Sequence, residues 1–238
     1  MKSKITFFLL GLFFIGFISC QNEISQTTQP TQNEVLTANS TITALVKNTV
    51  ANDGSKDNII DKASCVSIQL PVKVVVNGVE ITVNSEADYE IIEANFNEFE
   101  EDDDELEIIF PIVILLSDFT EVSINNSDEM EGFVDDCGGE NEMDDDIECI
   151  DFVYPVSFSI FDSANQLAET VTVINDEQFY KFVDDLEDYQ IVQINFPLKV
   201  VLFDGTEQTI NDMVMLETAI DNAKNKCDED DDNDFDDD

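Results

Sequence analysis

The amino-acid sequence predicts an α+β fold of two repeated ββαββα modules, each a mainly antiparallel four-stranded sheet with its helices on one face. Three observations lead to this prediction. A long alternating strand pattern occurs four times, each copy contains one proline, and an amphipathic helix pattern follows each copy. Two copies make one module, and 238 residues are enough for two small domains.

The strand pattern is clearest in residues 106–116, LEIIFPIVILL. Apolar residues occupy every second position through the proline, which is typical of a strand with one face on a core. The other copies are residues 66–76, 150–160 and 192–202. Because proline removes a backbone donor, we expect each strand to bend there. Its second half would pair in a hairpin with the short strand that follows, and its first half would pair with the other copy of the pattern in the same module, which we call the sister unit.

Each long strand is followed by a turn, a short strand and a helix. The dipeptides Asn77-Gly78 and Asp204-Gly205 suit two-residue hairpin turns. Each short strand ends in an aliphatic residue and an asparagine, whose side chain can accept from the free amides of a helix's first turn. These asparagines are Asn84, Asn125, Asn175 and Asn211. Apolar residues with helical spacing follow each of them, which predicts a helix with one face on a sheet.

The first residues read as an export signal. Residues 1–19 contain two early lysines, an apolar run from 5 to 18 and Ser19. The run is short for a membrane-spanning helix. Cys20 is placed as in a bacterial lipobox, in which the cysteine becomes the new N-terminus and carries diacylglycerol, although Phe17 stands where leucine is usual. We therefore expect a lipid anchor at Cys20, with plain secretion as the alternative.

The remaining segments differ from the modules in composition. Residues 20–64 begin with a polar stretch and are predicted to form a flexible tether, within which Ser40 could cap a short helix. The modules are then residues 65–137 and 149–227. An acidic linker, 138–148, joins them, and an acidic tail that we expect to be disordered, 228–238, follows.

The charge and the missing residue types exclude several functions. The chain has 54 Asp and Glu against 10 Lys and Arg, and its formal net charge is −44. Such a charge repels phosphate backbones and anionic head groups, so we expect no nucleic-acid partner and no membrane contact except the lipid. Without histidine there is no imidazole base or metal ligand, and without arginine no bidentate anion clamp. We therefore predict a protein that is not an enzyme and has no cofactor.

Four cysteines follow Cys20 and bracket the modules. Cys65 and Cys149 open them, whereas Cys137 and Cys227 close them. An exported protein is expected to form disulfides, and four cysteines allow three pairings. The repeat symmetry favours Cys65–Cys137 and Cys149–Cys227. A four-thiolate zinc site is the alternative, but the sequence has no CxxC pair.

The acidic tail suggests either cation binding or a solvated charged surface. Its aspartates alternate, and the first three match positions 1, 3 and 5 of a calcium loop, but Asn233 replaces the turn glycine. We expect weak calcium binding at most. The candidate ligands are Asp228, Asp230, Asp232, Asp234 and Asp236.

Four segments are distinctive enough to compare with a known family: SKDNIIDKASC (55–65), LPVKVVVNGVEITVNSE (70–86), DDDIECIDFVYPVSFSIFD (144–162) and CDEDDDNDFDDD (227–238). They resemble segments of the uncharacterised tandem-repeat lipoproteins of flavobacteria. The resemblance covers nearly all of residues 53–238. It implies export and anchoring at the outer membrane, on its periplasmic or cell-surface face, and it brings no known activity.

One hairpin turn also resembles a modification site. Asp162-Ser163-Ala164 is similar to the short acceptor sequence for O-glycosylation in these bacteria, which makes Ser163 a candidate site; an ordinary polar turn is the alternative.

The predicted function is a binding or structural role in a lipid-anchored envelope or cell-surface protein, whose partner and oligomeric state the sequence leaves open. The alternative is an acidic surface protein that binds divalent cations, and a carboxylate-dependent hydrolase is third. An exposed apolar groove would favour the first function, whereas converging carboxylates with a bound ion would favour the second.

Overall fold

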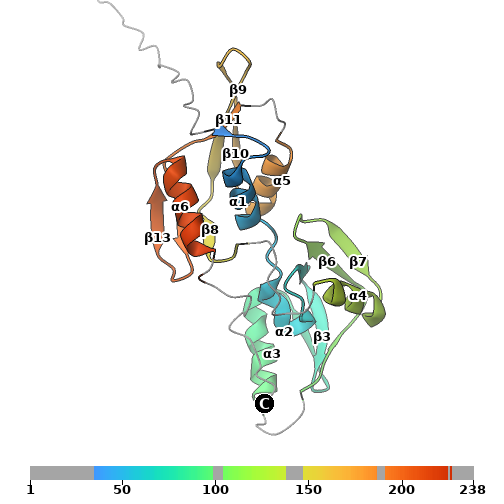
Figure 1. Ribbon diagram of the computed structural model, residues 1–238. Coiled ribbons are helices and arrows are strands. Elements are labelled where there is room, and N and C mark those ends of the chain that lie inside the picture. The colour runs from blue at the N-terminus through green and yellow to red at the C-terminus, as the bar shows by residue number, and fades with distance from the viewer. Residues whose placement is uncertain (1–34, 99–103, 138–146, 187–190, 225, 227–238) are drawn as a thin grey trace, which may run out of the picture.

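The computed structural model describes residues 35–98, 104–137, 147–186, 191–224 and 226. These residues form an α+β fold around two separate hydrophobic cores (Figure 1). The first core consists of residues between 59 and 130, and the second combines residues 36–50 with residues 147–223. Within the described ranges, no helix is long and apolar enough to cross a membrane.

All four long strands break at their proline, and the X-Pro bond is cis in each. The eight halves are β2 (Val66–Ile68) and β3 (Val72–Val76), β5 (Leu106–Ile108) and β6 (Ile112–Leu116), β8 (Ile150–Phe152) and β9 (Val156–Phe161), and β11 (Ile191–Ile194) and β12 (Leu198–Leu202). The predicted alternation holds in β3, where Val72, Val74 and Val76 are all buried.

The first halves pair across to the sister unit, which confirms the predicted bend. Strand β2 pairs with β6, β5 with β3, β8 with β12 and β11 with β9, all antiparallel. The second halves form hairpins with the short strands β4 (Val79–Val83), β7 (Glu121–Ile124), β10 (Leu167–Val173) and β13 (Glu207–Ile210).

The prediction of one four-stranded sheet in each module is wrong. Two three-stranded sheets, β2-β6-β7 and β4-β3-β5, cover the first core. The second core has β13-β12-β8 and a four-stranded sheet, β1-β11-β9-β10, whose added strand comes from the start of the described chain. The proline is responsible, because it ends the ladder of one half and turns the chain so that the other half enters a different sheet.

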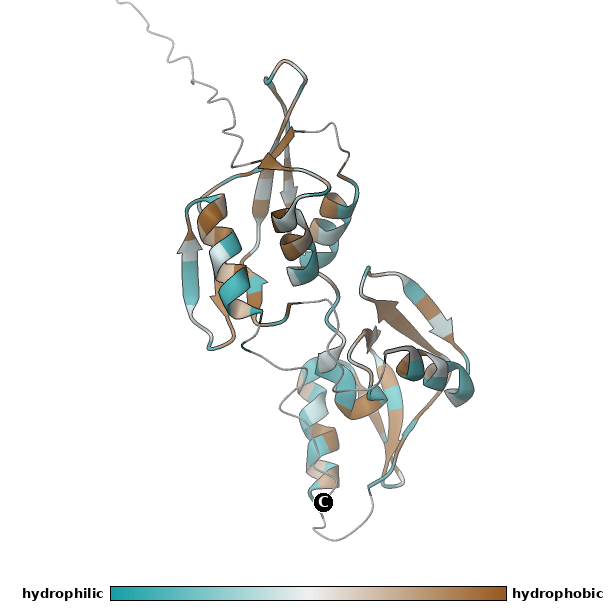
Figure 2. Cartoon of the chain, in the orientation of Figure 1, coloured by the Kyte–Doolittle hydropathy of each residue, from teal (hydrophilic) through white to brown (hydrophobic). Residues whose placement is uncertain are grey.

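The helices that follow the short strands begin within a residue or two of their predicted positions. They are η3 (Glu86–Asp88) with α3 (Tyr89–Phe96), α4 (Ser127–Cys137), α5 (Asp176–Asp184) and α6 (Met213–Ala223). The longer helices carry both hydrophobic and hydrophilic residues (Figure 2). Ile92, Phe179 and Leu216 are fully buried from α3, α5 and α6, as their one-sided stripes predict.

The predicted asparagine caps are correct at one helix and displaced by one residue at others. Asn175 Oδ1 accepts a hydrogen bond from Gln178 N at 3.0 Å at the start of α5. At α6 the cap is Asp212 instead of Asn211, and its Oδ1 accepts from Met215 N at 2.8 Å. Any short side-chain acceptor can satisfy these amides, so the residue after asparagine does so where the geometry is better.

The expected tether, residues 20–64, is folded in the part that the structure describes. Strand β1 (Val35–Leu36) pairs with β11. Helix α1 (Thr41–Thr49) begins at Ser40, as predicted, and Ser40 Oγ accepts from Thr43 N at 3.3 Å. Leu36 and Val46 are fully buried in the second core. The tether prediction is therefore wrong for this segment, because its apolar residues fill a face that the second module leaves open.

The same segment then enters the first core. Helix η2 (Ser55–Asp57) and helix α2 (Asn58–Asp61) bring Ile59 and Ile60 into that core, and the buried Asp57 Oδ2 accepts from Ile68 N at 2.6 Å. Gly54 allows the close approach, since a Cβ there would lie 2.2 Å from the Ser64 carbonyl oxygen. Residues 35–61 thus belong to both cores and connect them.

Candidate functional site

An apolar groove lies between helix α6 and the β12–β13 hairpin, and we call it the α6 groove. Its volume is about 460 Å³, which is within the range of ligand-binding pockets. The residues that line it are Leu202, Phe203, Gln208, Val214, Met215, Thr218, Ala219, Asn222, Ala223 and Lys226. Phe203 and Val214 are 61% and 63% exposed, and with Ile174 they are the most exposed large hydrophobic residues of the described chain.

The hairpin turn holds Phe203 at one wall of the groove. Phe203 N donates to the Cys149 carbonyl at 3.1 Å, and Gly205 N donates to the Leu202 carbonyl at 2.7 Å. Gly205 has a φ of 75°, a conformation that glycine adopts without a steric penalty. Because two backbone hydrogen bonds fix this turn, Phe203 is exposed on a defined scaffold instead of a loose loop.

Helix α6 forms the other wall. Its core stripe is occupied by residues such as Leu216 and Ile220, which are fully buried. The adjacent row, Val214, Thr218 and Asn222, has four-residue spacing and therefore runs along one side of the helix, where it lines the groove. Thr218 Oγ1 donates to the Val214 carbonyl at 2.7 Å, so this hydroxyl is already satisfied within the wall.

The groove differs from the rest of the chain in charge. Of the 238 residues 54 are acidic, yet none of the ten lining residues is, and Lys226 is the only charged one. An exposed apolar surface without carboxylates is suited to burial against another apolar surface, because no carboxylate has to be desolvated when the two surfaces meet.

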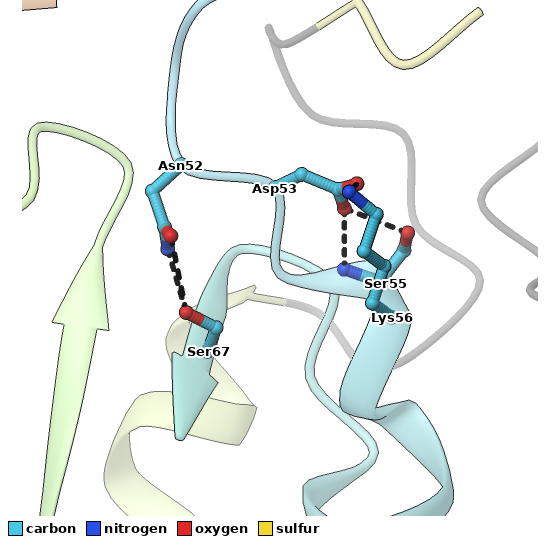
Figure 3. Close-up of polar contacts among 5 residues, drawn as sticks. All are labelled: Asn52, Asp53, Ser55, Lys56 and Ser67. Carbon is cyan, nitrogen blue, oxygen red and sulfur yellow. Dashed lines mark hydrogen bonds and ion pairs between the residues drawn. The ribbon is translucent and has the colours of Figure 1, made fainter. Parts of the chain in front are cut away.

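A second feature is a polar cluster in the segment that connects the cores. Figure 3 shows Asn52 beside Ser67, and Asp53 in contact with Ser55 and Lys56. Asn52 Nδ2 donates to Ser67 Oγ at 2.9 Å. Asp53 Oδ1 accepts from Ser55 N at 2.9 Å and Ser55 Oγ at 2.8 Å, and its Oδ2 lies 3.1 Å from Lys56 Nζ. The Asn52 bond attaches the connecting segment to the sheet β2-β6-β7, whereas the Asp53 contacts shape the segment itself.

The connecting segment faces carboxylates of the second core across a polar cavity of about 130 Å³. Asp151 and Asp176 line it together with Asp53 and Lys56, and the Tyr154 hydroxyl donates to Asp176 Oδ1. Burial raises the pKa of Asp151 and of Asp176. Burial and the Asp176 acceptor also raise the pKa of Tyr154.

Lys56 partly neutralises this cavity. Burial lowers the pKa of Lys56, but the neighbouring charge and hydrogen bond of Asp53 outweigh it, so the pKa is raised and Lys56 keeps its charge. The lining thus contains one ammonium group and four carboxylates, those of Asp53, Glu148, Asp151 and Asp176, which come from both the connecting segment and the second core. No group of three or more His, Cys, Asp or Glu side chains suited to a metal ion occurs among the described residues.

Aromatic rings also join the turn between β6 and β7 to helix α5. The rings of Phe119, in the turn after β6, and Tyr180, in α5, are 5.9 Å apart in an edge-to-face arrangement. Lys47 Nζ in α1 lies 4.8 Å from the Tyr180 ring centroid and 2.5 Å from Asp184 Oδ1. Tyr180 therefore contacts both the turn between β6 and β7 and the connecting segment.

Most of the site residues predicted from the sequence fall outside the described residues. These are Cys20, Cys227 and the tail aspartates Asp228, Asp230, Asp232, Asp234 and Asp236. Cys65 and Cys149 are disulfide-bonded. The side chain of Cys137 is not described, although its backbone ends α4, so the pairings Cys65–Cys137 and Cys149–Cys227 stay predictions.

Ser163 lies in the exposed turn between β9 and β10, as predicted. Asp162 Oδ1 accepts from Ala164 N at 2.8 Å and Gln166 N at 2.9 Å, which shapes the turn and leaves Ser163 accessible. Whether it is modified stays a prediction.

The α6 groove itself was not found by sequence reasoning, although two signals for it exist. Phe203 follows the last alternating residue of its strand, Leu202, and so breaks the period-two pattern. Val214 lies off the helical stripe that contains Leu216 and Ile220. Large apolar residues outside both periodic patterns are the ones that a core does not require.

Comparison of the chain with protein-family models, with curated proteins and with solved structures finds no match.

Proposed function

We propose that this chain is a lipid-anchored envelope or cell-surface protein that binds a partner in the α6 groove and does not catalyse a reaction. The observation that carries the proposal is the groove itself, where Phe203 and Val214 are more than 60% exposed on a fixed hairpin and a capped helix. Monomeric proteins rarely expose such side chains together around one groove unless another molecule covers them.

The polar cavity gives less support to an enzyme. Its lysine is held in an ion pair with Asp53, and the Tyr154 hydroxyl donates to Asp176. Both groups therefore have partners within the fold, whereas a nucleophile or a general base needs an adjacent activating group and access to substrate. This arrangement is better suited to fixing the connecting segment between the cores.

The lipid anchor would place the second core close to the membrane. Fifteen peptide units separate Cys20 from Val35, which begins β1, and they span at most about 50 Å when extended. Because β1 and α1 belong to the second core, the tether reaches that core before the first. The α6 groove lies on the surface of the part of the chain that surrounds the second core, so it would be available to a partner in or near the envelope.

We further propose that each core corresponds to one repeated ββαββα module closed by its own disulfide, Cys65–Cys137 or Cys149–Cys227. Two findings support this proposal. Among the described strands, each first half pairs with the second half of the other long strand around the same core. Cys65 and Cys149 are both disulfide-bonded. Peptide mapping without reduction should recover these two linked pairs; a link between the modules would contradict the proposal.

The binding function is tested by affinity capture after cross-linking on intact cells. Wild-type protein is compared with Phe203→Asp and with Ile174→Asp, a control at an equally exposed residue outside the groove. We expect one partner to be captured by wild type and by the control and to be lost with Phe203→Asp. Equal capture by all three proteins would show that the groove does not bind it.

A second candidate function is calcium binding by the acidic run, which the alternating aspartates from Asp228 to Asp236 suggest. At fixed ionic strength, millimolar calcium should then raise the melting temperature more than magnesium does, because calcium accepts irregular carboxylate geometry. Equal effects of the two ions, with or without residues 228–238, would indicate general screening of the negative charge instead.

A further inference from the structure

We propose that the polar cavity is a pH-sensitive contact between the two cores, which closes in acid and opens when Asp151 and Asp176 ionise. In the open form the cores would move apart about residues 50–54, which link α1 to η2. The proposal concerns the relative placement of the cores. It therefore goes beyond the binding function of the α6 groove and does not depend on it.

The cavity lies where the two cores share little other contact. Among the described helices and strands, none of the first core packs extensively on one of the second. The ring contact between Phe119 and Tyr180 is made at an edge, with 5.9 Å between the centroids. Parts of one chain that share only a small, polar interface are expected to move relative to each other. A change of charge in this cavity can therefore change the arrangement of the cores.

One side of the cavity is attached to the first core. Asn52 N donates to the Ser117 carbonyl at 2.9 Å, and Asn52 Nδ2 donates to the Leu115 carbonyl at 3.3 Å. Leu115 lies in β6 and Ser117 directly follows that strand. Asp53 and Lys56 come next in the chain and form an ion pair of 3.1 Å. This ion pair would stay with the first core when the cavity opens.

The other side carries three carboxylates of the second core. They belong to Glu148, Asp151 and Asp176. Asp151 lies in β8, and Asp176 is the first residue of α5. The neighbouring rings of Phe152 in β8 and Phe179 in α5 are 4.9 Å apart, so the two elements pack on each other within that core. Closure of the cavity therefore brings these carboxylates as a group against the ion pair of the first core.

The closed cavity favours neutral carboxyl groups. Burial raises the pKa of Asp151 and of Asp176, and it outweighs the charge of Lys56, which lowers both. Asp176 is the less exposed of the two, so we expect it to contribute more. The other titratable groups near the three side chains are Asp53, which raises the pKa of Asp151, Tyr154, whose hydroxyl lowers that of Asp176, Glu86 of η3, which raises that of Lys56, and Glu148.

The direction of the pH effect follows from these shifts. The contribution of Asp151 and Asp176 to closure is complete below their pKa in the open form. It is lost as the pH rises through their raised pKa in the closed form. Once ionised, the carboxylates are more stable in water than in the cavity, where Lys56 is the one ammonium group of the lining. Opening returns them to water.

Energy transfer between two dyes tests the proposal. The dyes are coupled to azido residues that replace Glu90 in α3 and Gln166 in the turn after β9, both exposed, so the native cysteines are not labelled. The mature chain with Cys20→Ala is measured from pH 5 to pH 8. A salt concentration of 300 mM keeps the Debye length below about 8 Å and suppresses general repulsion between the cores. We expect transfer to fall as the pH rises.

Three variants show whether the cavity causes this fall. Asp151→Asn with Asp176→Asn should keep transfer high and lose most of its pH dependence. The matched control, Glu169→Gln with Glu217→Gln, removes the same charge from β10 and α6 outside the cavity lining, and should follow wild type. Lys56→Met removes the compensating ammonium group, so transfer should fall at a lower pH than in wild type.

Circular dichroism shows whether each variant is folded. If the first double variant does not fold, Asp151→Asn alone, a change at an exposed side chain, should still reduce the pH dependence. Constant transfer in wild type from pH 5 to pH 8 would overturn the proposal, and so would equal pH profiles of the wild type and the Asp151→Asn variants. A control that loses its pH dependence as well would assign the effect to the general charge of the second core. None of these results involves Phe203, so the binding function of the α6 groove is tested separately.

Discussion

Replacement of Leu36 by alanine tests whether the segment before the first module is part of the second core. Leu36 is fully buried there, and its strand β1 pairs with β11. Leucine to alanine at a buried site costs about 2–5 kcal/mol, from lost transfer energy and the cavity left behind. Since β1 has only two residues and its surroundings can partly collapse, we expect about 3 kcal/mol.

Urea unfolding followed by hydrogen exchange and mass spectrometry measures this loss separately for each core. A loss of about 3 kcal/mol corresponds to a midpoint lower by about 1–3 M for a small domain, and only peptides of the second core should lose protection. The matched control is Leu167→Ala, because Leu167 is 49% exposed on β10 of the same core and should cost less than about 0.5 kcal/mol. Equal midpoints for the two variants would refute the assignment of β1 to this core.

Three further predictions concern the connecting segment, α1 and the polar cavity. Gly54→Ala should destabilise the first core by about 1–3 kcal/mol, since three backbone atoms lie within 2.6 Å of the added Cβ; the control Gly132→Ala in α4, which meets no atom within 4 Å, should be neutral or stabilising in urea melts. Lys47→Met removes the half-exposed ion pair with Asp184 and should cost no more than about 1–2 kcal/mol in thermal unfolding; a larger loss would show that this pair is a main support of α1. Burial raises the pKa of Asp176, so the stability that its carboxyl contributes is complete below its unfolded pKa, near 4, and is lost as pH rises through the folded pKa. Asp176→Asn should therefore reduce the decline in stability between pH 4 and pH 7, and an unchanged pH profile would contradict the assigned shift.

Local features of the fold could be predicted from the sequence because they depend on neighbouring residues. The alternation in residues 66–76 correctly indicated the buried face of β3, and the prolines located the four bends. Ser40 and Asn175 were correctly predicted as helix caps. A cap, a turn or a stripe is determined within about four residues, so its signal is contained in one short window.

Pairing between distant segments was only partly predictable. The exchange of strand halves followed from the lost proline donor, but the division into two sheets per core did not, because a period-two pattern does not specify how many sheets a bent strand joins. The register that joins Val66 to Leu116 depends on hydrogen bonds between residues fifty positions apart.

Only tertiary packing determined where residues 35–61 lie and which apolar side chains are exposed in the α6 groove. Leu36, Val46 and Ile59 are ordinary apolar residues in a polar stretch, and their sequence does not show that the first two enter one core and the third the other. Phe203 and Val214 have the same hydrophobicity as core residues, yet they are exposed because the sheet and the core stripe of α6 are filled without them. The burial of any apolar side chain lowers the free energy of the folded chain. Which of these side chains stays exposed, and can be covered by another molecule, is determined only by the assembled fold.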